Sequence, residues 1–232
     1  MKFLTILEQH GILTTRRTPE ERTKNYIIAT QKQIQQYIKN GSKGNLDLSN
    51  TPITSLPDNL KVGGIGDLDL RGTSITSLPN NLTVGGTLVI ADTPITSLPN
   101  NLTVGGSLDL TNTPITSLPD NLTVHGNLSL YKTPITLLPA NLKVKGLLNL
   151  SHTKITSLPD NLTIEGDLYI AYTPITSLPD NLTVKGDLNI NYTPISSLPN
   201  NLKVGRTLFV YETPLSKKYT VKQLRQMVPN VT

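Results

Sequence analysis

The sequence predicts a repeat solenoid, with a parallel β-sheet on one face, extended polyproline-like return segments and an α-helical cap at each end. The stretch TPITSLPDNLTV occurs word for word at Thr113–Val124 and again at Thr173–Val184. Near-copies recur every 20 residues from Thr73 to Thr213, after a first interval of 22 residues from Thr51. Only 36% of the 232 residues are hydrophobic, so a core is available only if neighbouring coils share it.

The N-terminal cap, residues 1–44, is predicted to centre on one helix. TPEE beginning at Thr18 combines a capping box with proline at the first helical position, and Gly41 stops the helix after about Asn40. A shorter helix is expected over Lys2–Gln9. The apolar face of the longer helix, which would cover the first coil, consists of Ile27, Ile34, Tyr37 and Ile38.

The solenoid itself, about nine coils, is predicted over residues 45–214. Each unit contains an alternating apolar pair, which is typical of a short strand with one buried face. Stacked at about 4.8 Å, such strands form a parallel sheet about 40 Å long. The pairs are Leu46/Leu48, Leu68/Leu70, Leu88/Ile90, Leu108/Leu110, Leu128/Leu130, Leu148/Leu150, Leu168/Ile170, Leu188/Ile190 and Leu208/Val210.

Three polar columns recur at fixed places in the unit. A threonine column, from Thr51 to Thr213, is expected to supply hydroxyls from coil to coil where the chain turns inward. An asparagine column, from Asn59 to Asn201, is expected to form a turn ladder or to adopt left-handed backbone. A glycine column, from Gly44 to Gly186, indicates either close packing or positive φ, and Arg206 interrupts it in the last full coil.

The C-terminal cap is predicted over residues 215–232. Thr220 is a suitable N-cap, and the helix should stop before Pro229. Val221, Leu224 and Met227 recur at helical spacing, so we expect them to seal the last coil.

The core pattern L-x-L-x-x-T-x-I-x-x-L-P-x-x-L resembles a leucine-rich repeat over about Asn45–Pro214, with threonine in place of the usual asparagine. The short repeat and its Leu-Pro resemble the bacterial class typified by type III secreted effectors, and tailed bacteriophages encode repeat proteins of similar wording. The resemblance implies a fold and leaves function open. The ubiquitin-ligase effectors of that class use a catalytic cysteine, and this sequence contains no cysteine.

The positive charge is concentrated at the two ends. Residues 1–44 contain eight Lys/Arg against three Asp/Glu, residues 45–212 nine against thirteen, and residues 213–232 four against none. These basic side chains are either the solvated faces of capping helices, or docking points for an acidic surface such as a neighbouring subunit. Nucleic-acid binding is disfavoured, because a binder of this shape would place its basic stripe along the sheet. The basic cap residues are Arg16, Arg17, Lys217, Lys218, Lys222 and Arg225.

The residues that vary between units lie on or beside the exposed face of the strand. Its C-terminal half is aromatic, and exposed aromatics are usual anchors of protein interfaces. They equally suit an exposed sheet without any partner, and stacking on a sugar or base is a third reading. The aromatic set is Tyr131, Tyr169, Tyr172, Tyr192, Phe209 and Tyr211, and the acidic set in the N-terminal half is Asp47, Asp67, Asp69, Asp92 and Asp109.

No catalytic or metal site is predicted, and no cofactor. The histidines, His10, His125 and His152, are scattered through the sequence, so we interpret them as ordinary exposed residues. His152 is expected to lie near Tyr131 and Tyr172, but no carboxylate is obviously paired with it. The opening MKFLTILEQHGIL lacks the apolar run and cleavage site of a signal peptide, and no segment suggests membrane insertion. We therefore expect a soluble protein in the cytoplasm of a bacterial or infected cell, or else a virion component.

Three functions remain open. The first is a non-enzymatic scaffold that binds a protein partner of unknown identity through the exposed sheet and its aromatic end. The second is a structural role in a virion or other assembly, with self-association through the basic caps. The third, carbohydrate binding or processing at Tyr169, Tyr172 and Tyr192, lacks any convincing acid/base pair.

Overall fold

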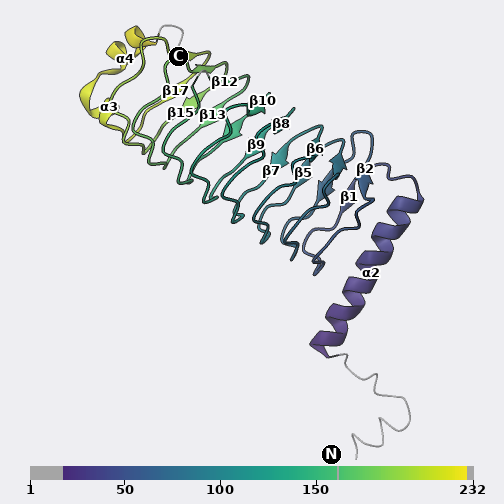
Figure 1. Cartoon of the computed structure of the whole chain (residues 1–232). Helices are drawn as coiled ribbons and strands as arrows, with labels where there is room; N and C mark the ends of the chain where they lie inside the picture. The colour runs from purple at the N-terminus through teal and green to yellow at the C-terminus, as the bar shows by residue number, and fades with distance from the viewer. Residues whose placement is uncertain (1–17, 161, 229–232) are drawn as a thin grey trace, which may run out of the picture.

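The computed structural model describes residues 18–160 and 162–228. They form one elongated solenoid, with helix α2 at one end and helices α3 and α4 at the other (Figure 1). This confirms the predicted fold class. The predicted helix over Lys2–Gln9 lies outside the described residues.

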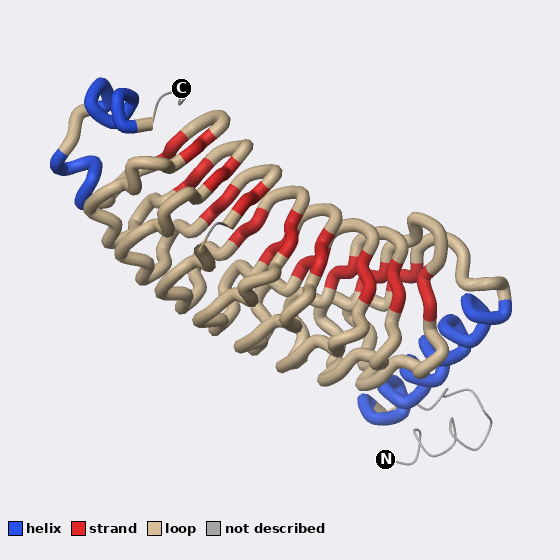
Figure 2. The backbone as a smooth tube through the Cα atoms, turned by 45° about the horizontal axis from the view of Figure 1, so that its top comes forward, coloured by secondary structure: helices blue, strands red, loops and turns tan. Residues whose placement is uncertain are grey.

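The main sheet follows the predicted strands in chain order. Within the described residues it has nine parallel strands, each paired with its equivalent in the next coil, and Leu46 pairs with Leu68 as Leu188 pairs with Leu208. Figure 2 shows the strands as a regular row along the solenoid. They are β1 Leu46–Asp47, β3 Leu68–Asp69, β5 Leu88–Val89, β7 Leu108–Asp109, β9 Leu128–Ser129, β11 Leu148–Asn149, β13 Leu168–Tyr169, β15 Leu188–Asn189 and β17 Leu208–Phe209.

The return side contains a second row of strands that the sequence did not predict. Among the described residues, the Leu-Pro segments form neither helix nor strand, but the Thr-Val, Thr-Ile or Lys-Val pair after each of them forms a short strand that pairs with a neighbouring coil. One sheet joins β2 Lys61–Val62, β4 Thr83–Val84, β6 Thr103–Val104, β8 Thr123–Val124 and β10 Lys143–Val144. A second joins β12 Thr163–Ile164, β14 Thr183–Val184 and β16 Lys203–Val204, so the row is interrupted between β10 and β12.

The core lies between these two rows and runs the length of the solenoid. In a middle coil, Leu108, Leu110, Ile115 and Val124 are all essentially inaccessible to solvent. Leu118 and Leu122 complete the same layer and are also buried. Each coil contributes one such layer and is covered by its neighbours, which is how a chain poor in hydrophobic residues obtains a continuous core.

The threonine column is buried, but its hydrogen bonds stay within one coil. Each hydroxyl donates to the carbonyl three residues earlier, at 2.6–2.8 Å, for example Thr113 Oγ1 to Leu110 O. The predicted coil-to-coil role was therefore wrong. The hydroxyl points back along its own chain because the preceding three residues form a tight turn, which places the carbonyl of Leu110 within reach of both the hydroxyl and the amide of Thr113.

The glycine column reflects close packing rather than positive φ. A Cβ on Gly106 would lie 2.7 Å from the carbonyl carbon of Gly86, well inside any allowed contact. Gly44, with φ +78°, is the member that does adopt left-handed backbone. The asparagine column contains both predicted features: Asn101 Nδ2 lies 3.5 Å from Asn81 Oδ1, and Asn181 has φ +64°.

Helix α2, Pro19–Lys39, begins with the predicted capping box and ends before Gly41. Its C-terminal half covers the first coil: Ile34 is buried and Gln33 Nε2 donates to the carbonyl of Asp47 at 3.0 Å. The N-terminal half extends away from the solenoid (Figure 1). Ile27, predicted to cover the coil, is half-buried and lies outside the core cluster, because the helix leaves the solenoid before that residue reaches it.

The C-terminal cap differs from the prediction in which side chains seal the core. Thr213 caps an additional short helix, α3 Pro214–Lys218, and Thr220 caps α4 Val221–Met227. Val221 and Met227 are 67% and 39% exposed, so the prediction that they seal the last coil was wrong. Leu224 is buried as predicted, whereas Leu215 and Val228 join the core cluster in place of Val221 and Met227, because the additional helix α3 brings Leu215 onto the last coil before α4 begins.

We predict that Thr113→Val lowers the free energy of unfolding by about 1 kcal/mol, since it removes a buried hydrogen bond at nearly constant volume. Because each bond lies within one coil, the effects of Thr113→Val and Thr133→Val should add. Urea denaturation measures both, with the exposed Thr103→Val as control. A clearly non-additive double variant would contradict the intracoil arrangement.

Candidate aromatic binding surface

The surface that varies between coils is organised around a turn with left-handed backbone. The residue before each threonine of the buried column has φ between +54° and +65° in every coil. In every coil but the last, its amide donates to the next coil, as in Tyr172 N–H to Asn191 O at 3.1 Å. We call these residues the turn column: Asn50, Gly72, Asp92, Asn112, Lys132, His152, Tyr172, Tyr192 and Glu212.

In the C-terminal half, the turn column carries a continuous row of rings. His152 stacks on Tyr172 with ring centroids 4.4 Å apart, and Tyr172 stacks on Tyr192 at 4.3 Å. Tyr131 and Tyr211 meet the two ends of this stack edge-on, at 5.2 Å and 5.4 Å. We refer to these five residues as the aromatic ladder. Tyr172, Tyr192 and Tyr211 are 48%, 41% and 60% exposed, so the ladder is a surface feature.

The residues of the ladder do not stabilise this turn more than asparagine, aspartate or glycine would. Asparagine, aspartate and glycine adopt left-handed backbone readily, whereas it costs about 1–2 kcal/mol for a bulky residue. Each pair of rings in contact stabilises the folded protein by about 0.5–1.5 kcal/mol. Stacking therefore roughly offsets the strain at His152, Tyr172 and Tyr192, and leaves no clear stability gain over the Asn112 found in another coil.

The tyrosine hydroxyls of the ladder interact with one another. Hydrogen bonding to Tyr172, followed by loss of hydration, raises the pKa of Tyr192 to about 12. The phenol of Tyr192 is therefore neutral over the whole physiological range. Burial and the nearby Asp167 and Asp187 carboxylates raise the pKa of Tyr169 as well.

The structure brings together four of the six predicted aromatic residues. Tyr169 and Phe209 lie on the neighbouring sheet face, separated in register by Asn189, and they make no ring contact with each other among the described residues. His152 joins the ladder beside Tyr131 and Tyr172, the neighbours expected from the sequence, although the sequence assigned it no role there. The signal was present: His152, Tyr172 and Tyr192 occupy the same place in three successive units.

The five predicted acidic residues each accept a local hydrogen bond. Asp47, Asp69 and Asp109 accept the amide two residues further along, at 2.9–3.0 Å. Asp67 accepts the amide of Thr87 in the next coil at 2.7 Å, and Asp92 accepts from the side chain of Asn112. The bonds to Ser49 lower the pKa of Asp47. Val89 stands between Asp69 and Asp109, so the acidic side chains of that column do not form an unbroken row.

Arg206 makes ion pairs that could not be predicted from the sequence, which showed only that this residue interrupts the glycine column. Its guanidinium forms ion pairs with Asp167, and with Asp187 at 3.6 Å, and so links three successive coils. Both aspartates also accept amides from the following coil. These carboxylates therefore bind groups of the solenoid itself, and they lie close to Tyr169.

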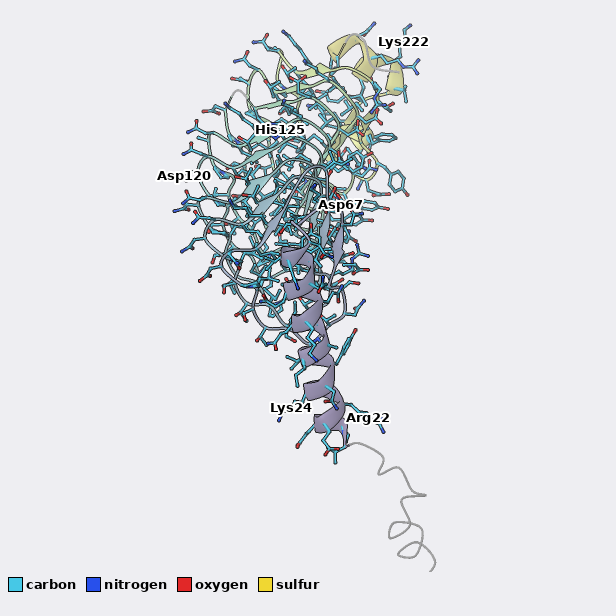
Figure 3. The ribbon with its side chains drawn as sticks, turned by 90° about the vertical axis from the view of Figure 1, so that its right-hand side faces the viewer. Arg22, Lys24, Asp67, Asp120, His125 and Lys222 are labelled. Atoms are coloured by element: carbon cyan, nitrogen blue, oxygen red, sulfur yellow. The ribbon has the colours of Figure 1, made fainter. Side chains whose placement is uncertain are left out.

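The basic cap residues lie at opposite ends of the molecule. Figure 3 labels Arg22 and Lys24 near the end of α2 that stands clear of the solenoid, and Lys222 at the far end. Lys217, Lys218, Lys222 and Arg225 are exposed on α3 and α4, and Lys217 lies 3.8 Å from Glu212. Arg16 and Arg17 lie outside the described residues.

The described residues contain no group of three metal-ligating side chains. His125 lies on the return side and His152 in the ladder. A groove of about 700 Å³ opens over the interruption between β10 and β12, lined by Lys143, Lys145 and Glu165 among others. In the part of the chain that the structure describes, no helix is both long enough and apolar enough to cross a bilayer.

Solved structures with the same architecture come from bacterial leucine-rich-repeat proteins. A Leptospira interrogans leucine-rich-repeat protein matches with a TM-score of 0.54 and 24% identity, over 82% of this chain and 54% of that one. YopM, a leucine-rich effector protein from Yersinia pestis, matches with a TM-score of 0.50 and 20% identity, over 73% and 54%. The chain thus spans about half the length of each. No protein-family model and no curated protein matches the sequence.

We predict that Tyr172→Asn is more stable than Tyr172→Ala by about 1 kcal/mol, because asparagine tolerates the positive φ of this position. Both variants lose the same ring contacts, so their difference isolates the backbone. Tyr131 is the matched control, since it belongs to the ladder but lies outside the turn column. Chemical denaturation should show that the Asn and Ala variants differ in free energy of unfolding at Tyr172 and differ little at Tyr131. Equal differences at both positions would show that the positive φ of Tyr172 is not the cause.

We also predict that Tyr172→Phe lowers the pKa of Tyr192 from about 12 towards 10.0, because it removes the main cause of the increase. A raised pKa means that the stabilisation is complete below pH 10 and is lost as the pH rises through the folded-state value. NMR of isotope-labelled tyrosine Cζ, with Tyr192→Phe for assignment, follows the titration. An unchanged Tyr192 titration in Tyr172→Phe would refute this origin of the shift.

Proposed function

We propose that the protein is a non-enzymatic scaffold that binds a protein partner through its exposed sheet, with the aromatic ladder as the anchor. The observation that carries the proposal is that three adjacent coils place His152, Tyr172 and Tyr192 where a smaller residue would satisfy the backbone equally well. Left-handed backbone at three successive ring-bearing positions, with no clear gain in stability from the stacked rings, is typical of functional surfaces.

The geometry of the rings favours a polypeptide over a sugar or base. Both faces of Tyr172 are covered by its neighbours in the ladder. Stacking ligands require an open ring face, and Tyr172 presents only its edge and hydroxyl group. Edges and hydroxyls suit backbone carbonyls and carboxylates, while the exposed Phe209 and Tyr211 add apolar area beside them.

The similar structures are consistent with this role without specifying it. Leucine-rich-repeat solenoids offer an extended surface from which a partner can contact several coils at once. One of the similar proteins is described as an effector, and an effector-like role within a bacterial or infected cell is the biological setting that we propose.

The test is capture from the lysate of the native host by wild-type protein and by the double variant Tyr172→Asn/Tyr192→Asn. Asparagine keeps the turn backbone, so this variant removes the rings without disturbing the fold. We expect wild type to retain one protein and the variant to lose it. Asp92→Asn, in the same column but outside the ladder, is the matched control and should behave as wild type.

Capture that is equal for all three proteins would overturn the ladder as the binding site. Self-association with no captured protein would instead favour a structural component of an assembly. In that case, charge reversal at Lys217 and Lys218 should abolish the association while the ladder variant leaves it intact.

A further inference from the structure

The two edges of the main sheet differ in how they are covered. In each coil but the last, three amides donate to carbonyls of the next coil; in the first coil they belong to Leu46, Leu48 and Asn50. A parallel strand at the end of a sheet leaves both amides and carbonyls without a neighbouring strand. At the N-terminal edge, helix α2 supplies donors, with Gln33 Nε2 donating to Asp47 O and Tyr37 Oη to Gly44 O.

Among the residues that the structure describes, none covers the C-terminal edge in this way. The equivalent amides of the last coil belong to Leu208, Val210 and Glu212, and none of the described residues offers them an acceptor. Leu208 and Val210 are only half-buried, whereas Leu188 and Ile190 at the same places one coil earlier are fully buried. The capping side chains Leu215 and Val228 therefore close the core but leave β17 open along its edge.

We propose that this edge binds an extended acidic segment of a partner protein, which adds to the sheet as one more strand. Three amides spaced two residues apart match the carbonyls of an incoming strand. Apolar side chains on the inner face of that strand would cover Leu208 and Val210.

The charge around the edge favours an acidic partner over a second copy of this chain. Residues 213–232 contain four basic and no acidic residues, and Lys217 lies 3.8 Å from Glu212. Two copies joined edge to edge would bring these basic ends together. Head-to-tail addition would need the first coil of the second copy, which α2 occupies.

This surface goes beyond the proposed ladder site, since it uses main-chain donors at the end of the sheet rather than side chains along its face. The probe is a capped peptide of alternating valine and glutamate, titrated into the full chain and followed by amide NMR signals. We expect saturable shifts centred on Leu208, Val210 and Glu212. A peptide of alternating valine and lysine should bind at least about tenfold more weakly.

Two variants separate pairing from charge. Val210→Pro removes an outward-facing amide that bonds to no other coil, so the fold should persist while peptide binding falls about tenfold or more. Lys217→Glu/Lys218→Glu should weaken binding several-fold and reduce its dependence on salt. Lys24→Glu/Lys32→Glu, the same charge change on α2, is the matched control and should have little effect.

The ladder variant Tyr172→Asn/Tyr192→Asn should bind the peptide as wild type does. The peptide titration therefore tests the sheet edge alone, and its outcome is independent of whether the ladder binds a partner. The edge proposal is overturned by no saturable binding up to about 1 mM. Undiminished binding to Val210→Pro, provided circular dichroism shows the fold intact, would equally overturn it. It is also overturned if sedimentation shows a dimer that Val210→Pro dissociates, because the occupant would then be a second copy.

Discussion

The backbone hydrogen bonds between successive coils are the interaction on which the rest of the structure depends. Three amides of each coil donate to the next at 2.7–3.2 Å along the main sheet. They fix the register, and the register places each buried leucine against its equivalent one coil away. Just before each strand, the glycine column lets successive coils approach closely, and a Cβ on a glycine such as Gly106 would collide with the preceding coil. A thin core is sufficient because each layer is covered twice.

The sequence allowed the sheet, its core and the main helix boundaries to be predicted, because a fixed period carries the same information many times. It did not predict the second row of strands: a Thr-Val pair is too short to show alternation, and its pairing depends on the neighbouring coils. The direction of the threonine hydroxyls was missed for a similar reason, since a column in the sequence does not show whether its bonds run along or across the coil. Ile27 and Val221 were misplaced because helix periodicity defines a face but not where the helix meets the solenoid.

At the candidate site, the sequence located the variable columns but not their grouping. Side chains at Tyr169 and Tyr172 are three residues apart, yet only Tyr172 enters the ladder, because the left-handed turn points it along the solenoid towards its equivalents. Positive φ at an aromatic residue runs against local preference, so composition alone could not indicate it. His152 was expected near Tyr131 and Tyr172, but its part in the ladder follows from those neighbours rather than from its own chemistry, so no role was assigned to it from the sequence.

The identical stretches at Thr113–Val124 and Thr173–Val184 have a genetic consequence. Recombination between them would delete 60 residues, three whole coils, and rejoin the chain without changing one core position or one turn. The product would keep both helical ends but lose Tyr131, His152 and Tyr172 together. Length and surface identity in this molecule are thus heritable in units of one coil. A lineage could acquire or discard a recognition surface by unequal crossover, without passing through a misfolded intermediate.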